Sequence, residues 1–217
     1  MQTTSTMSST KLNVLVKVSI LAVISLIVMM IEFPIPIFPS FLQIDLSDIP
    51  ALFGGFALGP VAGVLVVLLK NILHGILMTS TAWVGEVANF SVGVILVLVS
   101  SLIYHRTKSK KGAVIGLIAG TLAMSAVAGV LNYFFFLPAF AKVFHSPIQS
   151  FIDMAGAIFQ SIDTYVELVM FSIVPFNLLK GIIVSVVTLM LYKKVSPVIQ
   201  SQSKILKKLK AEKSASK

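Results

Sequence analysis

Of the 217 residues, 57% are hydrophobic and 12% are charged, whereas roughly 25% of the residues in a soluble domain are charged. This composition, with a mean hydropathy of +0.99, excludes a soluble globular protein and predicts a compact bundle of membrane-spanning helices. The formal charge of +9 does not indicate nucleic-acid binding, because the basic residues flank apolar runs, and the absence of cysteine excludes disulfides, thiolate metal sites and cysteine nucleophiles.

Apolar runs along the chain predict an all-α integral membrane protein that is a six-transmembrane-helix bundle. The first run, at about residues 12–31, is long enough to cross a bilayer. It is followed by a proline-rich segment and not by a small-residue cleavage site, so we expect a retained helix and not a signal peptide. The other helices are expected at about residues 48–59, 60–78, 83–105, 111–137 and 162–192.

The run from residue 49 to about residue 78 could be one long tilted helix or two short ones. Proline cannot continue the helical hydrogen-bond ladder, so Gly59-Pro60 is a possible break. Lysine and arginine decide between the alternatives, because 14 of the 17 lie in three clusters, at residues 11–17, 106–111 and 193–217. All three clusters face the cytoplasm only if the run breaks, as the positive-inside rule requires.

The sequence therefore predicts six spans with both termini cytoplasmic. The membrane domain is expected at residues 1–193 and a basic cytoplasmic tail at residues 194–217. The two longest outer loops are then residues 32–47 and about 138–161. The first carries Pro34, Pro36 and Pro39 among phenylalanines, a stiff and apolar pattern. It either rests on lipid headgroups or forms a lid over a cavity in the bundle.

Polar residues inside predicted spans need partners or a cavity, because each is costly in hydrocarbon. Asn177 and Lys180 are three positions apart and share one helix face. Lys180 lies 13 residues before Lys193, which is too far from the predicted cytoplasmic end for its side chain to reach the surface. Either it forms a structural ion pair or it contacts a ligand, together with the amide of Asn177.

Three further groups of polar or small residues lie in the other helices. Glu86 and Asn89 share a face near the outer end of the fourth helix, although Glu86 could simply sit at the headgroups. Gly129 precedes Asn132 by almost one turn and would permit a flat ligand to approach the backbone. Lys70 and His74 are interpreted as a structural polar network, because lysine is a poor partner in a metal site.

Amides with a few charges and aromatic rings suit a neutral, ring-containing solute that forms hydrogen bonds. Phosphate-loop, HExxH, nucleophile-elbow and Cys/His motifs are all absent, so neither ATP hydrolysis by a phosphate loop nor an enzyme is indicated. Six spans without a visible inverted repeat are few for a self-sufficient transporter. If the chain moves a solute, other subunits are expected to supply the energy.

Several motifs occur together in one order and resemble those of a known family. They are Phe33-Pro34-x-Pro36-x-Phe38-Pro39-x-Phe41-Leu42, Asp45-x-Ser47-Asp48-x-Pro50, Gly54-Gly55-Phe56-x-x-Gly59-Pro60, Lys70-Asn71-x-x-His74, Gly85-Glu86-x-x-Asn89, Asn132-Tyr133 and Pro175-Phe176-Asn177-x-x-Lys180. Over about residues 11–194 the sequence resembles the riboflavin-specific substrate-binding (S) subunits of energy-coupling factor (ECF) vitamin importers.

The resemblance implies a non-enzymatic, cofactor-free bundle in a bacterial plasma membrane, with riboflavin as the transported ligand in an outward-facing pocket. The implied partners are a transmembrane coupling subunit and two cytoplasmic ATPase subunits. By resemblance, Asn132, Asn177 and Lys180 would bind the pyrimidine edge of the flavin, with Gly129 at close approach. Further expected contacts are Phe41 and Leu42 from the lid, and Glu86 and Asn89 near the ribityl hydroxyls or in helix packing. The alternatives are an S subunit for another vitamin and a stand-alone ion-coupled permease.

Overall fold

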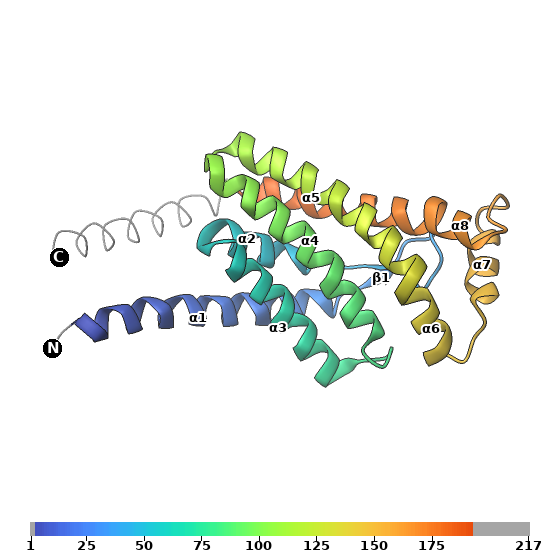
Figure 1. Cartoon of the computed structure of the whole chain (residues 1–217), viewed down its shortest axis with the longest axis horizontal. Coiled ribbons are helices and arrows are strands. Elements are labelled where there is room, and N and C mark those ends of the chain that lie inside the picture. Colours follow the sequence, from blue (N-terminus) through green and yellow to red (C-terminus); the bar gives the residue numbers. More distant parts are fainter. Residues whose placement is uncertain (1–2, 193–217) are drawn as a thin grey trace.

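The computed structural model describes residues 3–192, so the predicted basic tail at residues 194–217 lies outside the described residues. The described chain is a bundle of helices with one minimal hairpin (Figure 1). Its elements are α1 (Thr3–Met29), β1 (Phe33–Pro34), β2 (Gln43–Ile44), α2 (Asp48–Leu58), α3 (Pro60–Met78), α4 (Val84–Thr107), α5 (Lys110–Leu131), η1 (Asn132–Phe136), α6 (Leu137–Val143), α7 (Ile148–Gly156), α8 (Tyr165–Glu167), η2 (Leu168–Ile173) and a helix over residues 174–192.

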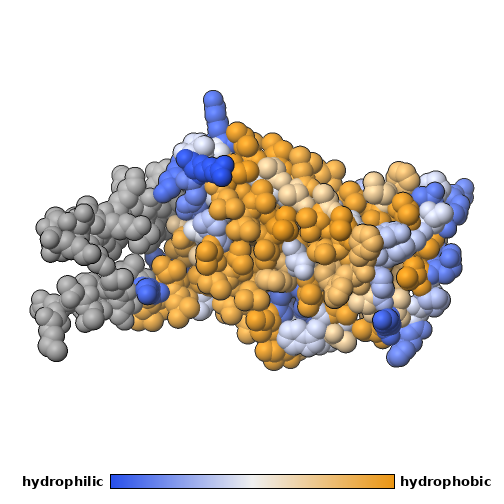
Figure 2. All heavy atoms as spheres, in the orientation of Figure 1, coloured by the Kyte–Doolittle hydropathy of each residue, from blue (hydrophilic) through white to orange (hydrophobic). Residues whose placement is uncertain are grey.

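Within residues 3–192, five helical stretches are long and apolar enough to cross a membrane, at Lys11–Met29, Pro60–Met78, Val84–Thr107, Lys110–Val143 and Tyr165–Tyr192. Their outward-facing side chains form a mostly hydrophobic surface over the middle of the molecule, with hydrophilic residues toward the ends (Figure 2). The predicted second span, α2, has 11 residues and is shorter than these stretches. At about 1.5 Å per residue it covers roughly half the thickness of the hydrocarbon layer.

The apolar run of residues 49–78 is divided at Gly59, as its Gly-Pro pair suggests. Gly59 has a φ of 119°, a backbone conformation that favours glycine. Pro60 is the first residue of α3, a position whose amide N–H has no partner within the helix, so proline loses no hydrogen bond there. The chain reverses there, and α2 packs among α1, α3 and α4. The fully buried side chains of Leu52 and Phe56 make α2 part of the main hydrophobic core.

Close contact between α2 and α3 depends on Gly63. A Cβ atom at this position would lie 2.8 Å from the Cα of Gly55 and 3.0 Å from the carbonyl oxygen of Ala51. We expect Gly63→Val to lower the free energy of unfolding by at least about 1–3 kcal/mol, because the two backbones must separate. Thermal unfolding in detergent measures this effect. Val61→Leu, at an exposed position two residues earlier, should leave the midpoint unchanged, and equal midpoints for all three proteins would contradict the prediction.

The prediction of an outer loop at residues 138–161 is wrong, because this segment contains the helices α6 and α7. Helix α5 continues through the π-helical turn η1 into α6, and the N–H of Leu137 donates to the carbonyl oxygen of Asn132, five residues earlier. Pro138 therefore does not end the helix but follows a turn with shifted hydrogen bonding. In Figure 1, α6 and α7 lie at the end of the bundle opposite the turn between α4 and α5.

Candidate functional site

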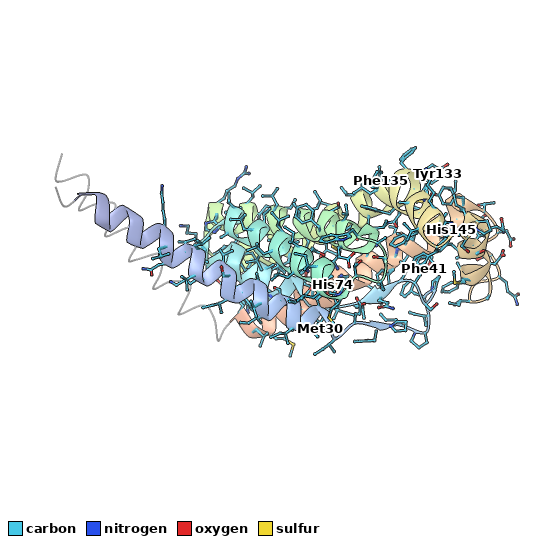
Figure 3. All side chains as sticks on the ribbon, turned by 90° about the horizontal axis from the view of Figure 1, so that it is seen from below. Met30, Phe41, His74, Tyr133, Phe135 and His145 are labelled. Atoms are coloured by element: carbon cyan, nitrogen blue, oxygen red, sulfur yellow. The ribbon has the colours of Figure 1, made fainter. Side chains whose placement is uncertain are left out.

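A cavity of about 310 Å³ opens at the end of the bundle that carries α6 and α7. Phe41 and His74, both labelled in Figure 3, approach it from the loop after α1 and from α3. The lining residues are Met29, Glu32, Phe41, Leu42, Gln43, Asp45, His74, Ser80, Thr81, Gly85, Glu86, Ala88, Asn89, Val92, Asn132, Phe140, Phe144, Phe151, Phe176, Asn177 and Lys180.

The loop between α1 and α2 covers this cavity. Its two short strands pair in antiparallel fashion, with Phe33 opposite Ile44. Phe38 packs edge-to-face on Phe176 at 5.4 Å between ring centroids, and Phe41 packs in the same way on Phe151 at 5.2 Å. These aromatic contacts hold the loop against the bundle. Of the two alternatives for the proline-rich loop, the structure therefore has the lid.

Two amide side chains enter the cavity beside π-helical turns. Asn132 is the first residue of η1, and Asn177 follows η2 on the helix of residues 174–192. Each donates its amide NH₂ to the carbonyl oxygen four residues earlier, at 2.8 Å for Asn132 and 2.9 Å for Asn177. These bonds fix the side-chain orientation, and the amide oxygens accept no hydrogen bond within the described part of the chain. Each asparagine can therefore still accept a hydrogen bond from a ligand.

Lys180 forms an ion pair with Asp45 from the lid, with 2.7 Å between Nζ and Oδ2. Their side chains are only 4% and 2% exposed. The amide nitrogen of Asn89 donates to the same carboxylate oxygen at 3.2 Å. Burial would raise the pKa of Asp45, but the charges of Lys180 and Lys70 outweigh it and hold that pKa below its usual range. Lys180 thus has the structural ion pair considered from the sequence, and it also lines the cavity.

A second ion pair lies next to the first. Lys70 contacts Asp48 at 2.6 Å between Nζ and Oδ1, and both side chains are fully buried. Lys70 also donates to the hydroxyl of Ser47, which in turn donates to Asp45. One continuous polar network therefore ties the lid and the start of α2 to α3 and to the helix of residues 174–192.

Glu86 is buried, with only 3% of its surface exposed, and has partners within the bundle. It accepts hydrogen bonds from Thr79 at 3.2 Å and Thr81 at 3.1 Å, and it pairs with Nδ1 of His74 at 2.9 Å. Lys70 and His74 do form structural polar networks, as predicted, but with different partners. Among the described residues, no group of His, Asp and Glu side chains is arranged to hold a metal ion.

The structure brings together most of the residues singled out in the sequence. The cavity is lined by Phe41, Leu42, Glu86, Asn89, Asn132, Asn177 and Lys180. Gly129 is not part of the lining, and a Cβ atom there would lie 2.7 Å from Cγ2 of Val174. Its small size therefore serves the packing of α5 against the helix of residues 174–192.

Sequence reasoning missed the aromatic wall from α6 and α7. Phe140 lies on α6 and stacks on Phe144, the residue that ends this helix, and Phe151 follows on α7. Their spacing was the available signal, since four residues is helical periodicity. Glu32 and Asp45 were also missed as lining residues, because charged loop residues are ordinarily expected to face water.

Comparison with known proteins agrees with this fold. The family model described as "ECF transporter, substrate-specific component" matches residues 13–192. The riboflavin transporter FmnP of Bacillus subtilis (strain 168) is 37% identical over 194 residues, which cover 88% of this chain and 96% of that protein. The riboflavin transporter RibU of Staphylococcus aureus (strain TCH60) is 35% identical over 182 residues, with coverages of 84% and 89%.

The fold itself also has a solved counterpart. The structure of the S component of a bacterial ECF transporter matches this chain with a TM-score of 0.68 at 33% sequence identity. The match covers 87% of this chain and 98% of that one. The similarity thus extends over almost the whole of each described molecule.

Proposed function

The chain belongs to the substrate-specific components of ECF transporters, and we propose that it binds riboflavin in the cavity beneath the lid for uptake into the cell. It is a transport component and not an enzyme. The observation that carries the proposal is the convergence of Asn132, Asn177 and Lys180 on one aromatic-walled cavity. Its volume of about 310 Å³ lies within the range of small-molecule sites, and its mixture of rings and few polar groups suits a flat heterocycle.

In the proposed complex, Asn132, Asn177 and Lys180 bind the pyrimidine edge of the flavin. The accepting amide oxygens and the donating ammonium match a ring edge that carries both N–H and C=O groups. Phe41 and Leu42 cover the ring from the lid. Glu86 and Asn89 come from α4 and are proposed to receive the ribityl hydroxyls.

The proposed topology has six membrane segments, with both termini in the cytoplasm of a bacterial cell and α2 as the short segment. Basic residues support it: the start of α1, with Lys11 and Lys17, and the turn between α4 and α5, with Arg106 and Lys108, lie at one end of the bundle (Figure 1). The cavity lies toward the other end. A ligand would therefore enter from outside the plasma membrane.

The energy for uptake is proposed to come from a transmembrane coupling subunit and two cytoplasmic ATPase subunits. The sequence carries no phosphate-binding loop of its own. Reconstitution distinguishes this proposal from a stand-alone permease. Liposomes with the chain alone should not accumulate riboflavin, and uptake without ATP would favour the permease.

Riboflavin binding tests the proposal directly. The purified protein should quench riboflavin fluorescence at about one ligand per chain. Asn177→Ala should weaken binding roughly tenfold, because one buried hydrogen bond to the ligand is lost. Asn13→Ala, on the exposed face of α1, serves as the matched control and should bind as the unchanged protein does. Absence of quenching, with binding of a different vitamin, would instead identify an S component of other specificity.

A further inference from the structure

The cavity carries more negative than positive groups. Three carboxylates line it, from Glu32, Asp45 and Glu86, against one ammonium, from Lys180. Asp45 forms an ion pair with Lys180, with 2.7 Å between Oδ2 and Nζ. Glu86 contacts the imidazole of His74, with 2.9 Å between Oε1 and Nδ1. Glu32 forms no ion pair with any residue in the described range 3–192, so its charge is not neutralised by a neighbouring cation in contact.

These carboxylates are close enough to influence one another. Glu32 remains exposed to water, but partial burial raises its pKa, and the charge of Asp45 raises it further. His74 and Lys180 oppose this rise, whereas Glu86 adds to it. Glu32 also follows the C-terminal end of α1, where the unpaired carbonyl groups carry partial negative charge. An additional anion brought to this wall would meet repulsion.

Glu32 and Glu86, which we call the acidic wall, both lie near His74. Glu32 lies in the loop three residues after α1, and His74 and Glu86 come from α3 and α4. Helix α3 packs against both α1 and α4. Asn132 and Asn177 come from η1 and from the helix of residues 174–192. In the proposed complex, the ring edge of the ligand meets the amides and its ribityl chain lies against Glu32 and Glu86.

We propose that Glu32 and Glu86 make the cavity select the unphosphorylated flavin, because they accept hydrogen bonds from ribityl hydroxyls and repel a terminal phosphate. This inference rests on the proposed riboflavin site. A hydroxyl can donate to a carboxylate, whereas a phosphate monoester carries about −1.5 to −2 charges and only accepts when fully ionised. Among residues 3–192, the lining contains no arginine and one lysine, Lys180, which already has a partner.

The test compares the Kd of flavin mononucleotide with the Kd of riboflavin, both measured by titration of the purified full-length protein. The unchanged protein should bind the phosphate ester more weakly. Glu32→Gln should lower the ratio of the two Kd values roughly three- to tenfold, as expected for removing one partly screened like charge. The Kd of riboflavin itself should change much less, because glutamine still accepts a hydrogen bond.

Glu86→Gln provides a second variant and should shift the ratio in the same direction. Asp163→Asn is the matched control, because Asp163 is an exposed acid that does not line the cavity, and it should leave the ratio unchanged. Added salt should also bring the ratio of the two Kd values closer to one in the unchanged protein, because it screens the repulsion, and this effect should be smaller in Glu32→Gln.

Tighter binding of the phosphate ester by the unchanged protein would overturn the inference. So would an unchanged ratio in Glu32→Gln with riboflavin binding intact. Failure of the unchanged protein to bind riboflavin at all would instead refute the proposed function. If Glu86→Gln fails to fold, Glu32→Gln alone decides the question, since Glu32 has no ion pair among the described residues to lose.

Discussion

Replacing Lys180 by methionine should weaken riboflavin binding by at least roughly tenfold to a hundredfold and also destabilise the protein. A hydrogen bond to a charged group contributes about 1.5–3 kcal/mol, and breaking a buried ion pair from one side costs about 3–5 kcal/mol. The second effect arises because the Asp45 carboxylate remains buried without its cation. Fluorescence titration measures the first effect, and thermal unfolding in detergent measures the second.

A double variant separates the two roles of Lys180. Lys180→Met combined with Asp45→Asn removes both charges and should recover much of the lost stability, whereas riboflavin binding should stay weak. If binding returned together with stability, Lys180 would have a structural role only and the proposed ligand contact would be wrong. Lys142→Met, at an exposed position on α6, is the matched control and should change neither property.

Replacing Lys70 by methionine should destabilise the protein as strongly as the change at Lys180, by about 3–5 kcal/mol, because Asp48 is left as a fully buried unpaired charge. Lys70 does not line the cavity, so the Kd of riboflavin for the folded protein should change less than it does in Lys180→Met. Thermal unfolding and fluorescence titration of the two variants, made side by side, provide the comparison.

The variant Lys70→Met with Asp48→Asn should regain stability, since no unpaired charge remains. A Lys70→Met protein that unfolds at the original temperature would show that the buried pair contributes little. Equal loss of riboflavin affinity in the Lys70 and Lys180 variants would show that the whole network, and not Lys180 alone, determines the ligand contact.

Local signals were sufficient for the division of the apolar run at Gly59. A glycine that must adopt positive φ and a proline at the start of a helix act through their own backbones, so neighbouring sequence is enough. The shared faces of Asn177 with Lys180 and of Glu86 with Asn89 are equally local, since they follow from helical spacing. These residues do line one cavity.

The partner of Lys180 could not be predicted in the same way. Asp45 lies 135 residues earlier in the chain, and only the packing of the lid on the last described helix brings the two together. The π-helical turns could not be predicted from the sequence for a related reason, because they depend on how a helix packs against its neighbours. Pro138 was consequently interpreted as the start of a loop, although the turn before it lets the helix continue.

The two ion pairs also bear on how the lid opens. Asp45 and Asp48 are anchored to different helices and have only two residues between them, so the end of the lid has almost no slack. Lifting the lid alone must separate Asp45 from Lys180, and moving it together with α2 must separate both pairs. Movement of the lid at this end is therefore coupled to the loss of at least one buried ion pair.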